Sequence, residues 1–373
     1  MALFDENVSI RPRRRRMTRG VLAGLWALAL AMVVLLVLTF LPTSYVVQRP
    51  GPVYNTLGTA STADGEEVPL ISVDGAETHE TSGALDLLTV QVVGNRERTP
   101  SWFELAVAWF DQTRAVLPID SVFPAGQTSE ERTEESAALM VDSQQEATAA
   151  ALIELGYDVG RTLLVHAIAP DSAAEGVLEV GDVIVSADGE PVADAAALRA
   201  LVESGDGATM TLEIERDGAQ RTVRLTPRET AGAEGAVWRI GVTLTNEYEF
   251  PFDVTIQIDN VGGPSAGMMF ALGIIDVLTP GELTGGESFA GTGTISAEGT
   301  VGPIGGIRQK MWGALDAGAD WFLAPQSNCG EVMGHVPDGL RVFSVATLDD
   351  ALDVLEAVRE DGDLDALPTC TTG

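Results

Sequence analysis

Hydrophobic residues near the start of the chain form one unbroken run. Residues 21–41 read VLAGLWALALAMVVLLVLTFL and contain no charged side chain. A helix of this length spans about 31 Å, which matches the hydrocarbon core of a bilayer. A cleaved signal peptide is the alternative, but its apolar stretch is shorter, about 7–15 residues, and is followed by a small-x-small site. The sequence PTSY follows here, so the pattern predicts a transmembrane helix.

Six arginines and only two acidic residues lie in residues 1–20. Cytoplasmic flanks of membrane spans are enriched in Lys and Arg, so this tail is expected in the cytoplasm. No second apolar run of that length occurs later in the sequence. The chain is therefore predicted to be a single-pass membrane protein, with everything from about residue 43 onward outside the cytoplasm.

The pattern of polar and apolar residues changes twice after the predicted span. Region 43–157 predicts a strand at 85–93 and helices at 102–115 and 134–155, the second ending before Gly156. Region 158–229 is a succession of short β patterns at 162–168, 183–186, 210–216 and 221–227, with helical stretches at 172–175 and 194–203. From 233 to 360 strands and helices alternate, which is typical of α/β domains, and 361–373 is a tail. The alternating elements are expected at 239–243, 254–258, 265–278, 290–296, 308–317, 321–324, 341–345 and 348–358.

Region 158–229 resembles a PDZ domain. The resemblance is carried by GRTLLV at 160–165, APDSAA at 169–174, VGDVI at 180–184 and DGEPV at 188–192. PDZ domains bind an extended peptide as an added strand and often bind its terminal carboxylate. The resemblance implies a peptide-binding strand formed by Arg161, Thr162, Leu163, Leu164 and Val165. A PDZ fold used only as a spacer is the alternative.

Composition narrows the functional classes. The formal net charge of -33 argues against a nucleic-acid partner, because phosphate binding requires clustered Lys and Arg. Cys329 and Cys370 are too few for a disulfide scaffold and lack metal-ligand spacing, so their pairing stays open. The three histidines form no metal motif, and no metal or other cofactor is predicted. The P-loop G-x-x-x-x-G-K-[ST] is absent, so no ATP binding of that kind is expected.

One of the 22 basic residues is a lysine, Lys310. Codon bias in a GC-rich genome accounts for the general depletion, but it does not explain why one position kept its lysine. Lysine, unlike arginine, can lose its proton within reach of neutral pH. Lys310 lies in a predicted helix among Ile307, Met311 and Ala314, and apolar surroundings favour the neutral amine. A snorkelling surface lysine is the alternative.

A second segment that could take part in catalysis is VGGPSAGMM at 261–269. A strand leads into this Gly-rich turn, and Ser265 is expected to open an almost wholly apolar helix. Free backbone N–H groups at a helix start suit an oxyanion, and Gly263, Pro264 and Ala266 are the expected oxyanion or substrate-backbone residues. A structural N-cap serine at the start of a buried helix is the alternative.

Residues 263–267 also match the G-x-S-x-G elbow of α/β-hydrolases. That fold requires a histidine after the serine, and His335 is the one histidine that follows Ser265. This alternative gives the lone lysine no role.

The two segments together resemble the proteolytic domain of Lon-type peptidases, since GPSAG, TGTIS at 292–296 and PIGGIRQK at 303–310 occur in order. The resemblance implies Ser265 as nucleophile and Lys310 as general base, with Thr292 bonded to the lysine. It extends to 83–93 and, more weakly, to 139–147, so that the PDZ module is inserted in the peptidase fold. The whole chain resembles the membrane-bound, PDZ-containing Lon-like proteases of bacteria. The fold class expected is α/β (α+β), with a β-rich PDZ module and one preceding transmembrane helix.

The resemblance implies an ATP-independent serine endopeptidase that acts on unfolded or loosely structured proteins. Its partners would be protein or peptide substrates, the cell membrane and, because Lon-like domains commonly form rings, further copies of itself. The alternatives are a signal-peptidase-like Ser-Lys hydrolase and a non-enzymatic PDZ adaptor on an inactive peptidase fold.

Overall fold

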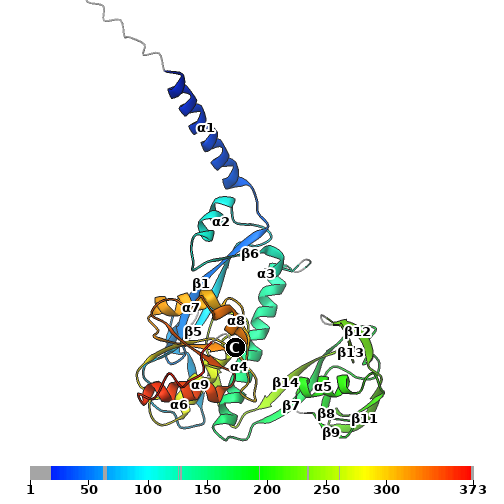
Figure 1. Ribbon diagram of the computed structural model, residues 1–373. Coiled ribbons are helices and arrows are strands. Elements are labelled where there is room, and N and C mark those ends of the chain that lie inside the picture. Colours follow the sequence, from blue (N-terminus) through cyan, green and yellow to red (C-terminus); the bar gives the residue numbers. More distant parts are fainter. Residues whose placement is uncertain are drawn as a thin grey trace, which may run out of the picture. The chain divides into compact units, whose positions relative to one another are not determined.

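The computed structural model describes residues 18–61, 65–124, 126, 128–192, 194–232, 235–259 and 261–370 (Figure 1). The chain folds into two compact units. The first comprises residues 1–51 and 90–132, and the second comprises residues 52–89 and 133–373.

The first described element of the first unit is a long apolar helix, α1 (Arg19–Phe40). The helix is long and apolar enough to cross a membrane, and no part of its most apolar stretch is buried in the protein. Its bounds agree within two residues with the span predicted at 21–41. Length and composition of this kind fit a membrane span or a signal sequence.

A small core follows α1 in the same unit. Leu105 and Ala108 pack there against Val47. The helix expected at 102–115 is shorter, because the Asp111 carboxylate accepts hydrogen bonds from the backbone and side chain of Thr113 and forms a turn. The elements of this unit after α1 are β1 (Tyr45–Asn55, which continues into the second unit), α2 (Trp102–Trp109), β6 (Ala115–Pro118, antiparallel to β1) and α3 (Ile119–Val122).

The second unit contains an α/β domain built on the strand order β20-β19-β16-β5-β1. Strand β16 is parallel to both β5 and β19, and β19 is parallel to β20. Its strands besides β1 are β2 (Thr59–Ser61), β3 (Glu67–Pro69), β4 (Ile71–Asp74), β5 (Ala84–Val93), β15 (Asp253–Ile256), β16 (Ser288–Gly291), β17 (Thr294–Ile295), β18 (Val301–Gly302), β19 (Trp321–Pro325) and β20 (Arg341–Val345). Its helices are α4 (Ser129–Glu154), α6 (Gly267–Leu278), α7 (Ile307–Ala317), the 3-10 helix η1 (Gln326–Asn328), α8 (Cys329–Val332) and α9 (Leu348–Arg359).

Alternation along the strands gives this sheet two buried faces. Phe322 of β19 packs in the same core as Met311 of α7. The next residue, Leu323, belongs to the core that holds Phe270 of α6 and Leu355 of α9. Because successive strand residues point to opposite faces, the helices cover both sides of the sheet.

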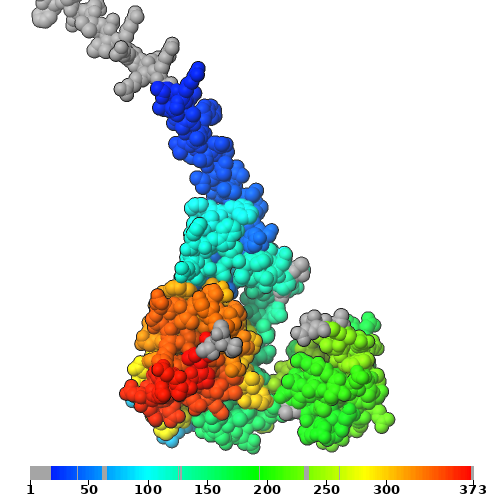
Figure 2. Space-filling view, viewed as in Figure 1, coloured from blue at the N-terminus to red at the C-terminus, as the bar shows by residue number. Residues whose placement is uncertain are grey.

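A β-rich domain in the same unit has a hydrophobic core of its own. Its sheet has the order β11-β10-β8-β7-β14, and Figure 2 shows its residues (green) as a compact lobe. The helical stretch expected at 172–175 is a series of turns. The elements are β7 (Gly160–Ile168), β8 (Val183–Ala187), β9 (Glu190–Pro191), α5 (Ala195–Ser204), β10 (Met210–Arg216), β11 (Ala219–Leu225), β12 (Arg228–Gly232), β13 (Gly235–Arg239) and β14 (Val242–Glu249).

The chain leaves the α/β domain after α4 and re-enters it at β15. Ile71 and Met140, which precede the β-rich domain, share one core with Leu272 and Phe343, which follow it. Strand β14 pairs with β7 along its whole length, so the β-rich sheet includes residues beyond the expected end at 229. The β-rich domain is therefore an insertion in the α/β domain.

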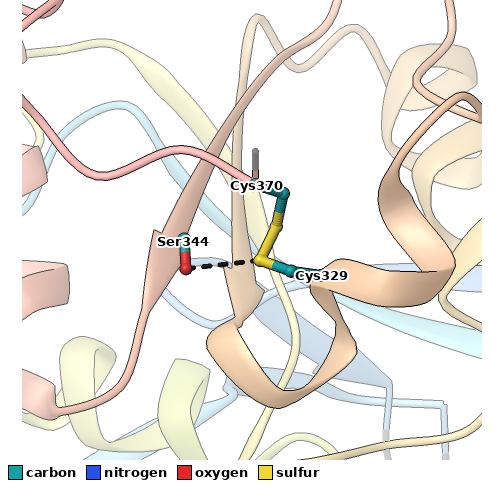
Figure 3. The surroundings of a disulfide bond; sticks show 3 residues. All are labelled: Cys329, Ser344 and Cys370. Atoms are coloured by element: carbon teal, nitrogen blue, oxygen red, sulfur yellow. Dashed lines mark hydrogen bonds between the residues drawn. A yellow bond between two sulfur atoms is a disulfide. The ribbon is translucent and has the colours of Figure 1, made fainter. Parts of the chain in front are cut away.

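A disulfide joins Cys329 to Cys370 (Figure 3). Their Cα atoms are 4.9 Å apart, and the Ser344 hydroxyl lies 3.4 Å from the sulfur of Cys329. The segment before Cys370 runs beside β20, where Ser344 N donates to Pro368 O. The pairing that the sequence left open is thus present, and it ties the C-terminal segment to α8.

Candidate active site

Ser265 lies in a tight turn between β15 and α6. Gly263 has a φ of 85°, a conformation that residues with a side chain rarely adopt, and its N–H donates to Ser136 O at 2.8 Å. The helix expected to open at Ser265 begins two residues later, at Gly267. Ser265 is half-buried in this turn.

Lys310 projects from α7 into the interior. The left-handed Gly306 (φ 72°) starts the helix, and Ile307, Met311 and Ala314 on the same helix are completely buried. Lys310 is itself only 1% exposed. Burial lowers the pKa of its amine from 10.5 to about 7, because an ammonium ion loses its hydration there. At about 1.4 kcal/mol per pKa unit, this removes on the order of 5 kcal/mol from the cost of a neutral amine at pH 7.

Three side chains meet at the lysine amine. The Nζ atom of Lys310 lies 2.8 Å from Ser265 Oγ and 2.8 Å from Thr292 Oγ1. The Thr292 hydroxyl in turn donates to the carbonyl oxygen of Ser265 at 2.9 Å. Since the threonine proton is used in that bond, its oxygen can only accept from the amine. A neutral Lys310 therefore donates to Thr292 and keeps its lone pair for the serine hydroxyl.

The structure distinguishes among the three expected oxyanion residues. The N–H of Gly263 already donates to Ser136, and Pro264 has no N–H. The carbonyl of Pro264 accepts from the Ser143 hydroxyl at 3.0 Å. Ala266, the N-cap residue of α6, is left as the one expected residue whose N–H has no hydrogen-bond partner within the ranges that the structure describes. Gly263 and Pro264 shape the turn.

Helix α4 supports the serine turn, and the sequence did not reveal this role. Ser136 and Ser143 both bond to the turn, through a backbone carbonyl and a hydroxyl respectively. Glu146, one helical turn beyond Ser143, accepts a hydrogen bond from Ala297 N at 2.7 Å. The family resemblance covers 139–147 but implies no role for any side chain there. Ser136, Ser143 and Glu146 are at helical spacing, but the alanines around the helix leave this spacing without a clear polar face.

The histidine required by the hydrolase alternative is elsewhere. His335 is exposed, and its Nδ1 lies 3.0 Å from the carbonyl oxygen of Met333. The hydroxyl of Ser265 contacts Lys310 instead. Within the part of the chain that the structure describes, no group of three or more His, Cys, Asp or Glu residues could hold a metal ion.

The expected peptide-binding strand is not at the edge of its sheet. Residues Arg161 to Val165 lie in β7, which pairs with β8 on one side and β14 on the other. A peptide cannot add a strand to β7, because both of its hydrogen-bonding edges are occupied. Leu163 and Val165 are buried in the domain core.

A groove of about 760 Å³ lies instead between α5 and the chain at residues 237–244. Strand β14 is the last strand of its sheet, so its outer edge faces this groove. The lining residues are Ala169, Ala195, Leu198, Arg199, Val202, Glu203, Val237, Trp238, Arg239, Ile240, Gly241, Val242, Thr243 and Leu244. The structure thus moves the candidate peptide groove from β7 to the edge of β14.

Comparison with known proteins matches both domains. The family model of the Lon protease (S16) C-terminal proteolytic domain matches residues 258–358, and that of the PDZ domain matches residues 164–216. A Lon protease of Azospirillum brasilense is 38% identical over 93 residues, which are 24% of this chain and 11% of that protein. An archaeal Lon protease of Methanothermobacter thermautotrophicus is 32% identical over 147 residues, which are 38% of this chain and 20% of that protein.

The chain therefore spans about a fifth or less of the length of these curated relatives. Among solved structures, the PDZ domain of the SdrC-like protein from Listeria monocytogenes is 24% identical. It covers 22% of this chain and 85% of that chain, with a TM-score of 0.20. The family matches confirm the resemblance drawn from the motifs and, with the α/β architecture, the expected fold class.

The lowered pKa of Lys310 predicts an acid limb in the pH dependence of peptide cleavage. Only the neutral amine can accept the serine proton, so kcat/KM should fall about tenfold per unit as the pH drops below about 7. Above that pH it should level off. Initial rates on a fluorogenic peptide between pH 5.5 and 9 would measure the limb. A midpoint near 10, or a rate that falls as the pH rises through 7, would contradict the assignment.

Proposed function

We propose that this chain, which combines a Lon-type proteolytic domain with an inserted PDZ domain, is a membrane-anchored, ATP-independent serine endopeptidase acting outside the cytoplasm. The observation that carries the proposal is the buried Lys310 amine at 2.8 Å from the hydroxyl of Ser265. An amine that is half neutral near pH 7 can act as a general base for an adjacent nucleophile.

The geometry supports a two-step mechanism. As the Ser265 oxygen attacks the scissile carbonyl, its proton moves to the neutral Lys310 amine. The ammonium ion then gives this proton to the departing amine of the substrate, and an acyl-enzyme remains. The same amine next takes a proton from water as the water attacks the ester, and returns it to the serine oxygen. Thr292 keeps the lysine aligned through both steps.

The developing negative charge on the substrate oxygen also needs a partner. The N-terminus of α6, two residues after Ser265, carries the partial positive charge of the helix dipole. We assign the N–H of Ala266 as a donor to the oxyanion.

Anchoring and location rest on separate features. Helix α1 has the length of a membrane span, and the arginines before it favour a cytoplasmic N-terminus. The disulfide between Cys329 and Cys370 supports an oxidising compartment for the rest of the chain. No P-loop occurs in the sequence, so the proposed substrates are proteins that are already unfolded or have loose termini.

Substitution of the dyad tests the proposed chemistry. Ser265→Ala, Lys310→Ala and Lys310→Arg should each lower kcat on an unfolded, carboxymethylated protein by at least about 10³-fold, because each removes the nucleophile or the base. Lys310→Arg keeps the charge but cannot lose its proton. Gel-based cleavage by the full-length protein in detergent would measure the rates.

His335→Ala is the matched control and should cleave at the wild-type rate. Full activity in Ser265→Ala or Lys310→Ala would end the dyad assignment. Cuts confined to A-x-A-like sites near the membrane would favour the signal-peptidase-like alternative. If Ser265 is not labelled by a fluorophosphonate while the groove still binds peptides, the chain is a PDZ adaptor.

We further propose that the groove between α5 and β14 recruits substrate ends. Ala195→Glu places a carboxylate in the groove and should repel a peptide's terminal carboxylate. We expect KM for the unfolded protein to rise about tenfold, as for the loss of about 1.4 kcal/mol of binding, while kcat on a short amidated peptide stays unchanged. Ala196→Glu, on the exposed side of the same helix turn, is the control. An equal KM in both variants would exclude recruitment through this groove.

A further inference from the structure

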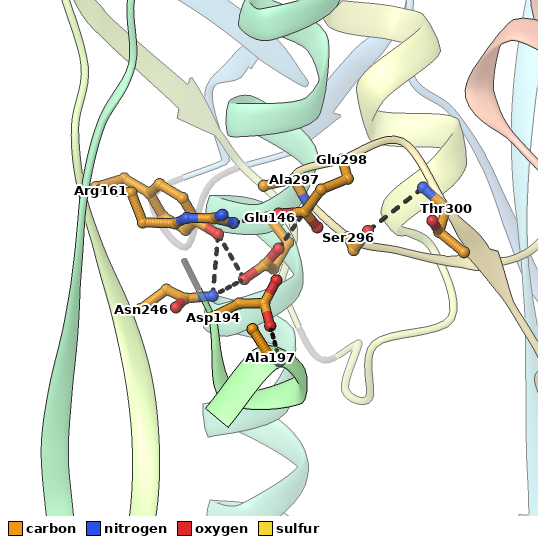
Figure 4. A network of polar contacts seen from close by, with 10 residues as sticks. Glu146, Arg161, Asp194, Ala197, Asn246, Ser296, Ala297, Glu298 and Thr300 are labelled. Carbon is orange, nitrogen blue, oxygen red and sulfur yellow. Dashed lines mark hydrogen bonds and ion pairs between the residues drawn. The ribbon is translucent and has the colours of Figure 1, made fainter. Parts of the chain in front are cut away.

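Glu146 contacts both domains of the second unit. Its Oε1 atom accepts hydrogen bonds from the Tyr248 hydroxyl at 2.7 Å and from Asn246 Nδ2 at 3.0 Å. Its Oε2 atom accepts from Ala297 N at 2.7 Å. Figure 4 shows this carboxylate between the strand that bears Asn246 and the segment that bears Ala297. One side chain of α4 therefore joins a strand of the PDZ domain to a loop of the proteolytic domain.

The PDZ side of this contact belongs to the wall of the groove. Tyr248 and Asn246 lie on β14, whose earlier residues Val242 to Leu244 line the groove. Burial, and then the hydrogen bond to Glu146, raise the pKa of the Tyr248 hydroxyl, so it keeps its proton and remains a donor. A displacement of β14 would therefore move the two donors that are hydrogen-bonded to the Glu146 carboxylate.

The proteolytic side of the contact leads directly to the dyad. Ala297 is buried and follows β17, which begins two residues after Thr292. The intervening Gly293 donates its N–H to Ser265 O at 3.0 Å and accepts from Met268 N at 3.2 Å. Only four residues lie between Ala297 and Thr292, the threonine that orients Lys310. The side chains of such a short, hydrogen-bonded segment have little freedom to absorb a displacement. A shift at one end of the segment is therefore transmitted to the other end.

Two further contacts strengthen the connection. Ser143, on the same face of α4, bonds to Pro264 O beside the nucleophile. Arg161 of β7 forms an ion pair with Glu298, the residue after Ala297 (Figure 4). Both strands of the β7–β14 pair are thus bonded to the region around the dyad.

We propose that Glu146 is a positioning residue through which the PDZ domain sets the alignment of Thr292 and Lys310. The PDZ domain then acts on the rate of the chemical step as well as on recruitment. The inference rests on the proposed dyad, but it concerns residues that lie outside the dyad and outside the groove.

The experiment uses a fluorogenic hexapeptide with an amidated C-terminus, which offers the groove no carboxylate. Tyr248→Phe and Glu146→Gln should each lower kcat at least about fivefold, at the lower end of typical coupling between sites, with KM changed less than twofold. The double variant should be no slower than Glu146→Gln alone, because both changes break one contact. The concentration of active enzyme is measured by titration with a fluorophosphonate, so that misfolded protein does not affect the value of kcat.

Tyr157→Phe and Asp142→Asn are the matched controls and should keep the wild-type kcat. Tyr157 packs its ring on Phe252, and Asp142 is an exposed carboxylate of α4. If Tyr248→Phe and Glu146→Gln turn over at the wild-type rate while Ser265→Ala does not, the inference fails and the proposed function stands. If the wild-type protein neither cleaves nor labels, the proposed function itself fails.

A second inference concerns the first unit, where α2 has apolar side chains on two faces. Leu105 and Ala108 pack into the small core. On the opposite side Phe103, Val107 and Phe110, at helical spacing, are 55%, 45% and 91% exposed. Trp109 is 63% exposed. An exposed aromatic stripe of this kind marks an interaction surface.

The chain ties this helix to the end of α1. Thr43, three residues after Phe40, donates its hydroxyl proton to Pro100 O at 2.8 Å and its N–H to Thr99 Oγ1 at 3.2 Å. Ser101, the N-cap of α2, follows directly. Three residues reach at most about 11 Å, so Pro100, two residues before α2, lies within that distance plus one hydrogen bond of the end of the proposed span.

We infer that the exposed face of α2 docks on the outer surface of the bilayer. Tryptophan and other amphipathic aromatic residues favour the interface between headgroups and acyl chains, and an apolar helix face can insert there. The inference rests on α1 being retained as a membrane span.

Quenching by lipids brominated on their acyl chains tests the docking. Full-length Trp26→Leu protein is reconstituted in vesicles, so that the tryptophan of α1 does not contribute. Its fluorescence should be quenched, and the added Trp109→Leu change should remove at least about half of the quenching. Absence of quenching in the Trp26→Leu protein, with the protein still in the vesicle fraction, overturns the inference. If concentration-dependent self-association appears instead and Phe110→Ser abolishes it, the face binds a second copy. Recovery of the protein outside the vesicles means that the anchor itself was wrongly assigned.

Discussion

The burial of a single amine governs the chemistry available to this protein. An ammonium ion at the position of Lys310 would lose its hydration and gain, among the residues that the structure describes, two hydroxyl partners. Because neither partner is charged, nothing offsets the cost of the charge, and the pKa falls to about 7. An arginine in the same place would stay charged at every physiological pH. The side chain that is rarest in this sequence is therefore the one whose proton the site can remove.

The fold holds that amine next to the serine by using both faces of one sheet. Lys310 comes from α7, which packs on one face, and Ser265 precedes α6, which packs on the other. Thr292 follows β16 in the sheet between them and bonds to both. The alternation of side chains along the strands buries the two helices on opposite sides. The Lys310 amine and the Ser265 hydroxyl meet where the ends of the two helices approach the end of β16.

Much of this arrangement was predictable, because its signals are local. The apolar run of α1, the Gly-rich turn before Ser265 and the apolar neighbours of Lys310 are all readable within a few residues. The candidate peptide groove was not predictable, because an open edge is a property of sheet order. The PDZ resemblance placed the peptide along residues 161–165, but β14, some eighty residues later, occupies that edge. Glu146 was missed for a related reason. Its helix is rich in alanine on all sides, so periodicity does not show which side the carboxylate faces.

The PDZ domain is inserted between α4 and β15, and its contacts with the proteolytic domain go beyond what substrate recruitment requires. At the base of the insert, β7 follows α4, which supports the serine turn, and β14 leads into β15, which precedes that turn. A flexible pair of linkers would let the PDZ domain present peptides without touching the site. Instead, Arg161 and Tyr248 at the base of the pair are bonded to Glu298 and Glu146. Each bond restricts the conformations of two side chains, which flexible linkers would leave free. These bonds hold β7 and β14 in one position relative to the loop that they contact. Holding them there serves a purpose if the position of the two strands affects that loop.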